Sequence, residues 1–267
     1  MDKLTVTGLV VREAAMRDND KLLTLLTAEH GKMTVTGKGV RSLKNKNMVT
    51  SQLFCYASYV LTKNKSGYYY ISDSDLIESF FGLRGDLLRL SLATYICEVA
   101  DHISVEENDE RPLLRLVLNI LYAAAKEKRP LPQIKGAFEL RCAVISGFMP
   151  DLSGCSVCGD STLPSYYLDI LNGEIVCPGC ISKRGRDIYA GEGGGEWTRP
   201  FISASPQLLD AMRYTIEADI SRLLSFSLPG VLQEQYAAAC ERYLLHHIGR
   251  GFNTLDYYKN FQRIDKR

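Results

Sequence analysis

Cys155-Ser-Val-Cys158 is followed, after eighteen intervening residues, by Cys177-Pro-Gly-Cys180. This spacing fits a four-cysteine zinc site, in which each CxxC turn directs two thiolates toward one tetrahedral ion. The intervening stretch contains Asn172-Gly173 between two apolar runs, and Asn-Gly in that position is typical of a β-hairpin turn. The pattern therefore predicts a zinc ribbon that has one CxxC turn at each end of a hairpin.

Two other interpretations of these cysteines are a disulfide pair and a redox dithiol. Disulfides are typical of secreted proteins, and no secretory signal peptide is recognisable. A redox dithiol needs one CxxC motif at the start of a helix, not two motifs. The remaining cysteines lie in apolar sequence, as buried free thiols do: Cys55, Cys97, Cys142 and Cys240. We favour zinc, and because four thiolates fill its coordination shell, we expect a structural ion and not a catalytic one.

The composition is that of an ordinary globular protein. Of 267 residues, 46% are hydrophobic and 24% are charged, and 32 basic residues against 31 acidic ones give a net charge of +1. This balance does not by itself indicate a nucleic-acid-binding protein, so any cationic surface must come from local clustering. No apolar run approaches the ~20 residues that span a bilayer. We therefore expect a cytoplasmic protein without membrane contact.

The first 75 residues predict a small β-barrel. They contain five short β-rich segments separated by glycine-containing turns, at 4–11, 22–28, 32–36, 52–61 and 67–72. Five strands within about seventy residues are typical of an OB-fold. The tyrosines of the last two segments, Tyr56, Tyr59 and Tyr68 to Tyr70, could stack on bases, although tyrosines in strands more often pack in the core.

A local excess of positive charge follows the third segment. Between residues 32 and 46 there are five basic residues and no acidic one: Lys32, Lys38, Arg41, Lys44 and Lys46. Most of them lie in a glycine-containing loop that we expect to be mobile, and such residues can contact phosphates without sequence preference. They are the candidate DNA-binding residues. The alternative is a solvated loop that is basic by chance.

From residue 76 the apolar pattern takes on a helical period. We expect the helical domain to span 76–152 and 186–250, with the ribbon inserted at 153–185 and a C-terminal tail at 251–267. The predicted fold is therefore α+β and multidomain. The sequence contains no Walker loop, nucleophile elbow, His-Glu-x-x-His pair or carboxylate dyad, so it indicates a binding protein without a catalytic centre.

Several stretches resemble the RecO family of bacterial recombination mediators. They are residues 8–12 (GLVVR), 25–32 (LLTAEHGK), 37–41 (GKGVR), 138–141 (FELR), 147–152 (GFMPDL), 177–180 (CPGC) and 242–250 (RYLLHHIGR). The resemblance implies an N-terminal OB-fold, a helical domain and an inserted zinc ribbon. It also implies binding of single- and double-stranded DNA, annealing of complementary strands, and partnership with RecR and with single-stranded-DNA-binding protein. Together with these partners the protein would load RecA, and it would be associated with the nucleoid.

The resemblance gives the candidate residues their roles. The five basic residues between 32 and 46 would contact phosphates. Lys135 and Arg141 would receive the acidic, Phe-ending tail of single-stranded-DNA-binding protein, because charge pairing and one buried aromatic ring can hold such a tail. Two alternatives are an enzyme acting on nucleic acid, in which zinc only stabilises the fold, and a protein-interaction scaffold that does not bind DNA.

Overall fold

The computed structural model describes residues 3–16, 18–182 and 201–265. The chain forms two compact units, Met1–Leu131 with Phe252–Arg267 and Pro132–Gly251. The predicted end of the ribbon, at residue 185, lies outside the described residues. No helix in the described part of the chain combines the length and the hydropathy that a bilayer crossing requires.

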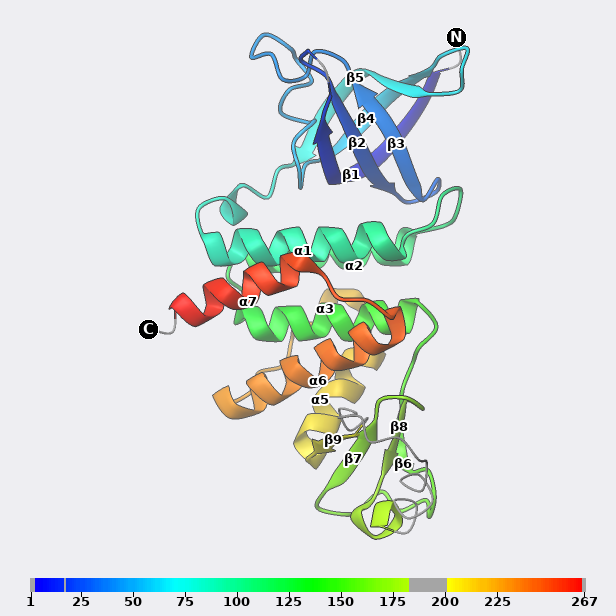
Figure 1. Ribbon diagram of the computed structural model, residues 1–267, viewed down its shortest axis with the longest axis vertical. Helices are drawn as coiled ribbons and strands as arrows, with labels where there is room; N and C mark the ends of the chain where they lie inside the picture. Colours follow the sequence, from blue (N-terminus) through cyan, green and yellow to red (C-terminus); the bar gives the residue numbers. More distant parts are fainter. Residues whose placement is uncertain (1–2, 17, 183–200, 266–267) are drawn as a thin grey trace, which may run out of the picture. The chain divides into compact units, whose positions relative to one another are not determined.

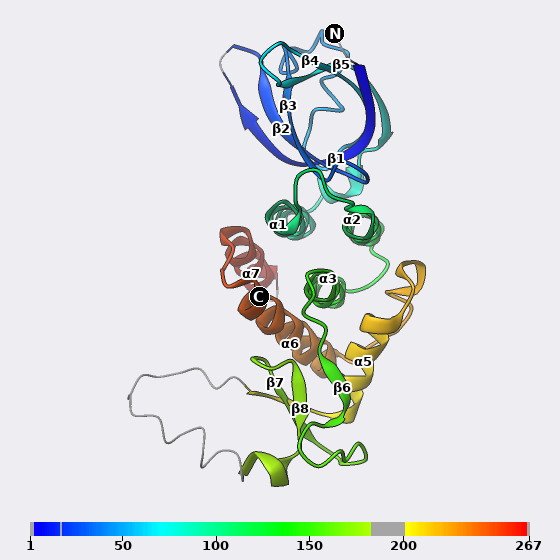
Figure 2. The same ribbon diagram turned by 90° about the vertical axis from the view of Figure 1, so that its right-hand side faces the viewer.

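The first unit contains a closed five-stranded barrel (Figures 1 and 2). Its strands are β1 (Lys3–Ala15), β2 (Lys21–Thr27), β3 (Lys32–Gly37), β4 (Tyr56–Lys63) and β5 (Tyr69–Glu78). They pair in the order β1-β2-β3-β5-β4, and β1 closes the barrel by pairing with β4. Only β3 and β5 run parallel. This topology confirms the predicted OB-fold, although β5 continues to Glu78, beyond the predicted domain end at residue 75.

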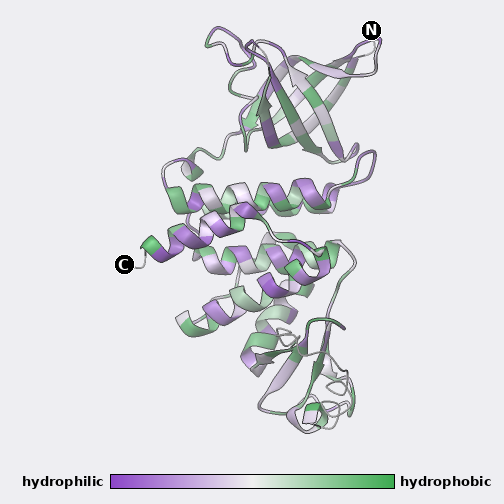
Figure 3. Ribbon diagram, in the orientation of Figure 1, coloured by the Kyte–Doolittle hydropathy of each residue, from purple (hydrophilic) through white to green (hydrophobic). Residues whose placement is uncertain are grey.

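Alternating residues of the strands fill the barrel, as a two-residue period requires. Hydrophobic and hydrophilic residues accordingly alternate along the barrel strands in Figure 3. The buried residues of this core are Val6, Val10, Leu23, Leu25, Met33, Val35, Ala57, Tyr59, Leu61 and Ile71. The hydroxyl group of Tyr59 donates to the carbonyl oxygen of Thr50 at 2.7 Å, and burial raises the pKa of this phenol. Tyr59 is therefore a core residue and not a stacking surface.

Three helices complete the first unit: α1 (Leu87–Ile103), α2 (Arg111–Ala125) and α7 (Asn253–Asp265). A 3₁₀ turn, η1 (Phe81–Leu83), precedes them. Asp86 caps α1 by accepting from the backbone N–H of Arg89, and Pro112 lies in the first turn of α2. Phe252 packs edge-on against Tyr95 of α1, with the ring centroids 5.8 Å apart. Residues 251–267, predicted as a tail, therefore contain a helix that packs on α1.

The second unit combines helices with a small sheet. The helices are α3 (Leu131–Ile145), α5 (Pro206–Glu217) and α6 (Gly230–Ile248), and the strands are β6 (Asp151–Cys155), β7 (Tyr166–Asp169), β8 (Glu174–Val176) and β9 (Phe201–Ala204). Gly136 of α3 lies against Tyr236 of α6, where an added Cβ would come within 2.6 Å of the ring. The helices predicted as one domain are thus divided, α1 and α2 belonging to the barrel unit and α5 and α6 to the ribbon unit.

The sheet of the second unit has the order β6-β8-β7-β9. β7 and β8 form the predicted antiparallel hairpin around Asn172 and Gly173. Gly173 has a φ of +66°, and an added Cβ there would lie 2.6 Å from the hydroxyl oxygen of Tyr243. Glycine is required at this turn both by its backbone conformation and by this close approach. β9 pairs with β7 and extends the predicted ribbon by one strand.

Candidate metal centre and nucleic-acid interface

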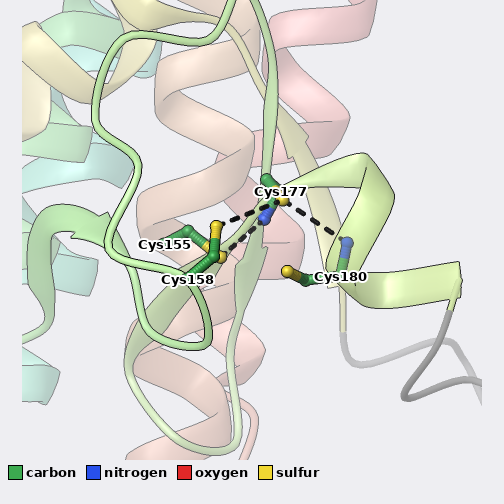
Figure 4. Close-up of side chains that lie close together, drawn as sticks. All are labelled: Cys155, Cys158, Cys177 and Cys180. Carbon is green, nitrogen blue, oxygen red and sulfur yellow. Dashed lines mark hydrogen bonds between the residues drawn. The ribbon is translucent and has the colours of Figure 1, made fainter.

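The ribbon brings the four predicted cysteines together (Figure 4). Cys155 ends β6, Cys158 lies in the turn that follows, Cys177 follows β8, and Cys180 lies in a helical turn. Their sulfur atoms all lie within 4.8 Å of one another, and the Sγ atoms of Cys158 and Cys177 are 3.9 Å apart. The cysteines are free thiols, so the disulfide interpretation has no support in this geometry.

Backbone geometry fixes the first turn. The N–H of Gly159 donates to the carbonyl oxygen of Cys155 at 2.8 Å, and Gly159 has a φ of +77°. Gly154 lies so close to this turn that an added Cβ would be 3.0 Å from the carbonyl oxygen of Gly159. The backbone N–H of Ser156 donates to Ile175 of β8 at 2.9 Å, which ties the turn to the sheet. These contacts hold the first pair of sulfur atoms beside the second.

The electrostatics of the cluster favour a bound cation. Burial raises the pKa of the Cys155 thiol, but backbone N–H groups of Cys177, Cys158 and Val157 lower it to about 6. The neighbouring Cys177 side chain, together with burial, raises the pKa of Cys180 to about 12. Four thiolates this close repel one another, so they coexist only when a cation compensates their charge. The cluster could bind a metal ion and is, within the described ranges, the sole group of its kind.

Four of the five candidate DNA-binding residues lie together on the loop between β3 and β4. The side chains of Lys38, Arg41, Lys44 and Lys46 are exposed. The Lys38 ammonium lies 4.3 Å from the ring centroid of Tyr70 on β5, and the Arg41 guanidinium donates to the carbonyl oxygen of Asp18 at 3.2 Å. Lys46 forms an ion pair of 2.7 Å with Asp73, which offsets part of its charge.

Lys32 lies apart from this loop. Its ammonium donates to the carbonyl oxygen of Asp101 at 2.7 Å and lies 3.6 Å from the Asp101 carboxylate. The backbone N–H of Lys32 donates to Val105, beyond the end of α1. These contacts join β3 to the helices of the same unit, so they give Lys32 a structural role that the sequence analysis did not assign to it.

The loop between β3 and β4 is compact. Val40 is buried against Gly37, and Asn47 and Thr50 are buried as well. The hydroxyl group of Ser74 on β5 donates to Asn47 Oδ1 at 2.8 Å and is hydrogen-bonded to Thr50 Oγ1 at 2.6 Å. Glycine content does not reveal these contacts with a distant strand, so the sequence did not predict them. These contacts hold the loop against the barrel, with its four cationic side chains exposed.

The hairpin between β4 and β5 adds cations that the sequence analysis did not select. Lys63 and Lys65 are exposed there, and the Lys63 ammonium lies 5.2 Å from the ring centroid of Tyr69. The side-chain amide of Asn64 donates to the hydroxyl oxygen of Tyr70 at 3.2 Å. Tyr70, which Lys38 covers, therefore links this hairpin to the cationic loop. The lysines beside the run of three tyrosines could have indicated a nucleic-acid-binding segment, but the same residues are also typical of an ordinary turn.

The two candidate partner-binding residues have structural partners. The Lys135 ammonium lies 2.9 Å from Glu139 and 2.7 Å from Glu241, and its side chain is only 4% exposed. The Arg141 guanidinium donates to the carbonyl oxygens of Thr215 and Ile216, near the end of α5. Lys135 is therefore part of a buried ion network, and Arg141 is hydrogen-bonded to the end of α5.

Comparison with known proteins agrees with this architecture. The family models described as recombination protein O N terminal and recombination protein O C terminal match residues 1–80 and 84–192. A protein of Acetivibrio thermocellus named DNA repair protein RecO is 28% identical over 264 residues, which cover 99% of both chains. A protein of the same name from Symbiobacterium thermophilum is 29% identical over 94% of this chain and 95% of its own. Another, from Clostridium novyi, is 30% identical over 70% of this chain and 73% of its own. Together the two family models match well over half of the sequence, and the structure contains the barrel and the ribbon expected for that family. This chain therefore belongs to the RecO family.

Proposed function

We propose that this chain is a DNA-binding recombination mediator that acts in DNA repair. The observation that carries the proposal is the set of exposed cations that a compact loop holds on the OB-fold barrel: Lys38, Arg41, Lys44 and Lys46. Relatives that align over nearly their whole length are named DNA repair protein RecO, which supports the same role. The chain would bind both single- and double-stranded DNA, because both carry the phosphates that these cations contact.

The same cationic surface would also promote the annealing of complementary strands. Two complementary strands repel each other through their phosphates, and a cationic surface that binds both reduces this repulsion and holds them close. The net charge of the whole chain is only +1, so the attraction must come from the local cluster. No bond is made or broken in this mechanism, and the proposed protein is not an enzyme.

The four-cysteine cluster would hold one structural zinc ion. Sulfur donors from Cys155, Cys158, Cys177 and Cys180 are the ligand set that favours zinc in a tetrahedral site. All four positions would be filled by the protein, so the ion would stabilise the ribbon and take no part in chemistry. The sheet of the second unit is short, which makes such support physically useful.

The proposed partners are RecR and single-stranded-DNA-binding protein, with which this chain would load RecA onto coated strands. Family membership supports this part of the proposal. The tail-binding role predicted for Lys135 and Arg141 has no support in their contacts, since both cations are bonded within the second unit. The proposed place of action is the cytoplasm, at the nucleoid, where the DNA lies.

The test is to replace Lys38, Arg41 and Lys44 together with alanine and to measure affinity for a labelled single strand at several salt concentrations. If each residue contacts one phosphate, the slope of log K against log salt should become less steep by about 2, since each contact in single strands contributes about 0.7. At 0.1 M salt the affinity should fall on the order of 100-fold. Fluorescence anisotropy provides both quantities.

The matched control removes three exposed cations elsewhere in the same unit: Arg115, Lys126 and Lys128. This variant loses the same formal charge and should keep the wild-type slope. If the two variants have equal affinities and slopes, general charge and not the loop governs binding. If the wild-type chain does not bind DNA at low salt, the scaffold alternative replaces the proposal.

A further inference from the structure

Tyr68 is held outside the barrel by a rigid hairpin turn. Asn64 Oδ1 accepts from the backbone N–H groups of Ser66 and Tyr68 at 3.0 and 2.9 Å. The backbone N–H of Asn64 donates to the carbonyl oxygen of Tyr68 at 2.9 Å, and Gly67 takes the positive φ that the turn requires. The Tyr68 side chain is 68% exposed. These bonds order the backbone of the turn, and a large aromatic ring is thus exposed to solvent outside the core.

Tyr68 directly precedes β5, and the alternation of that strand, continued by one residue, accounts for the exposure of Tyr68. Tyr69 packs against the barrel core, so Tyr68 and Tyr70, one residue before and after it, face the opposite side. The ring of Tyr70 is covered by the Lys38 ammonium at 4.3 Å. Lys65 is exposed in the same turn as Tyr68. An open aromatic face is therefore combined with cations on one side of the barrel.

We propose that Tyr68 stacks on an unpaired base of a nucleic acid strand, while Lys38 and Lys65 contact the adjoining phosphates. The proposal rests on the DNA-binding function above and deepens it by assigning a residue that distinguishes single strands from duplexes. In a duplex the faces of each base are covered by neighbouring base pairs, so Tyr68 has no face to stack on. In a single strand the faces are accessible, and stacking on tyrosine is tolerant of sequence because every base has a π-face.

Tyr70 would act differently from Tyr68, as a positioning residue. Its ring lies under the Lys38 ammonium, and its hydroxyl group accepts from Asn64, a residue of the turn that also contains Tyr68, at 3.2 Å. Lys38 belongs to the β3–β4 loop, whereas Tyr68 belongs to the β4–β5 hairpin. Tyr70 therefore connects the phosphate-binding loop with the stacking residue, and one strand could contact both.

The test is Tyr68→Ala, measured by anisotropy with a thymidine oligonucleotide, an abasic oligonucleotide of the same length and a duplex. Affinity for the thymidine strand should fall about 5- to 150-fold, the range for losing one stacked base. Affinity for the abasic strand and for the duplex should stay within twofold of wild type, and the salt slope should not change, because no phosphate contact is removed. Tyr68→Phe keeps the ring and should retain wild-type affinity for the thymidine strand.

The matched control is Tyr257→Ala, which removes a tyrosine of similar exposure, 63%, from α7. It should leave all three affinities unchanged. Equal losses on thymidine and abasic strands, or no loss on the thymidine strand, would overturn the stacking proposal. The function proposed above would survive either result if the Lys38, Arg41 and Lys44 variant still shows the less steep salt slope and the weaker binding predicted for it. A wild-type chain that binds none of the three ligands would overturn both.

Discussion

At the scale of single residues, Lys135 is a buried charge of the second unit that lies between two carboxylates. Burial lowers the pKa of its ammonium, but the carboxylates of Glu139 and Glu241 outweigh this effect and raise the pKa above its ordinary value. Because the folded-state pKa is raised, the stabilisation is fully present below the ordinary pKa of lysine and is lost as the pH rises through the folded value. At neutral pH this ion network therefore contributes its full stabilisation.

Lys135→Met should destabilise the folded chain by about 3–5 kcal/mol at pH 7, because the fully buried Glu139 carboxylate loses its ion pair with Lys135. The midpoint of urea unfolding at constant slope measures this change. Adding Glu139→Gln to the same variant should restore much of the loss, since it removes the uncompensated charge.

Lys126→Met is the control for Lys135→Met, because Lys126 is exposed and its replacement should change stability by no more than about 0.5 kcal/mol. If Lys135→Met were no more destabilising than this control, the buried ion network would not be a stabilising feature at neutral pH.

At the scale of elements, the ribbon and the loop between β3 and β4 are fixed in different ways. Buried residues such as Val40 and hydrogen bonds to β5 order the loop. The ribbon strands β7 and β8 are four and three residues long, and two CxxC turns bring their ends together. Short strands bury little apolar surface, so we expect the ribbon to depend on its ion far more than the loop depends on any single contact.

Cys155→Ser should therefore remove most of the bound zinc and lower the stability of the second unit. Structural zinc sites contribute about 10–16 kcal/mol of binding energy in small peptides, so losing one ligand weakens a large stabilising contribution. Metal analysis of the purified chain gives zinc per protein, and limited proteolysis should detect faster cutting within the ribbon. A chelator added to the wild-type chain should produce the same cutting pattern.

Cys55→Ser is the matched control for the ribbon cysteine. Cys55 is a buried thiol of the barrel unit, its Sγ donates to the carbonyl oxygen of Val49 at 3.1 Å, and a serine hydroxyl can make the same bond. This variant should keep its zinc and its proteolysis pattern. Zinc that stays bound to Cys155→Ser would show that Cys155 is not a necessary ligand.

At the scale of the whole molecule, the sequence predicted elements better than their assembly. Alternating apolar residues predicted the barrel and CxxC spacing predicted the ribbon, because both are local patterns. The sequence did not predict that β9 joins the ribbon sheet, that α7 packs on α1, or that the helices are divided between two units. A helical period indicates which face of a helix is buried but not which element covers it. The ion pairs of Lys32 with Asp101 and of Lys135 with Glu241 were not predictable for the same reason, since the partners are distant in sequence.

Annealing is the property that requires the whole proposed mechanism, because it needs binding of two strands without chemical change to either. The wild-type chain should accelerate annealing of two labelled complementary strands, measured by energy transfer between their dyes. With Lys38, Arg41 and Lys44 replaced by alanine, the acceleration at 0.1 M salt should be at least about tenfold smaller, because phosphate contacts are lost. Replacing Arg115, Lys126 and Lys128 should leave the acceleration unchanged.

The same annealing reactions, run with Mg²⁺ or Mn²⁺ and analysed on a denaturing gel, separate a mediator from an enzyme. Both strands should remain at full length, because four sulfur ligands leave a zinc ion no open position at which to activate water. Shortened strands that depend on the protein would contradict the non-enzymatic mechanism. If the wild-type chain and the loop variant annealed the strands equally fast, the cationic loop would not be the surface that promotes annealing.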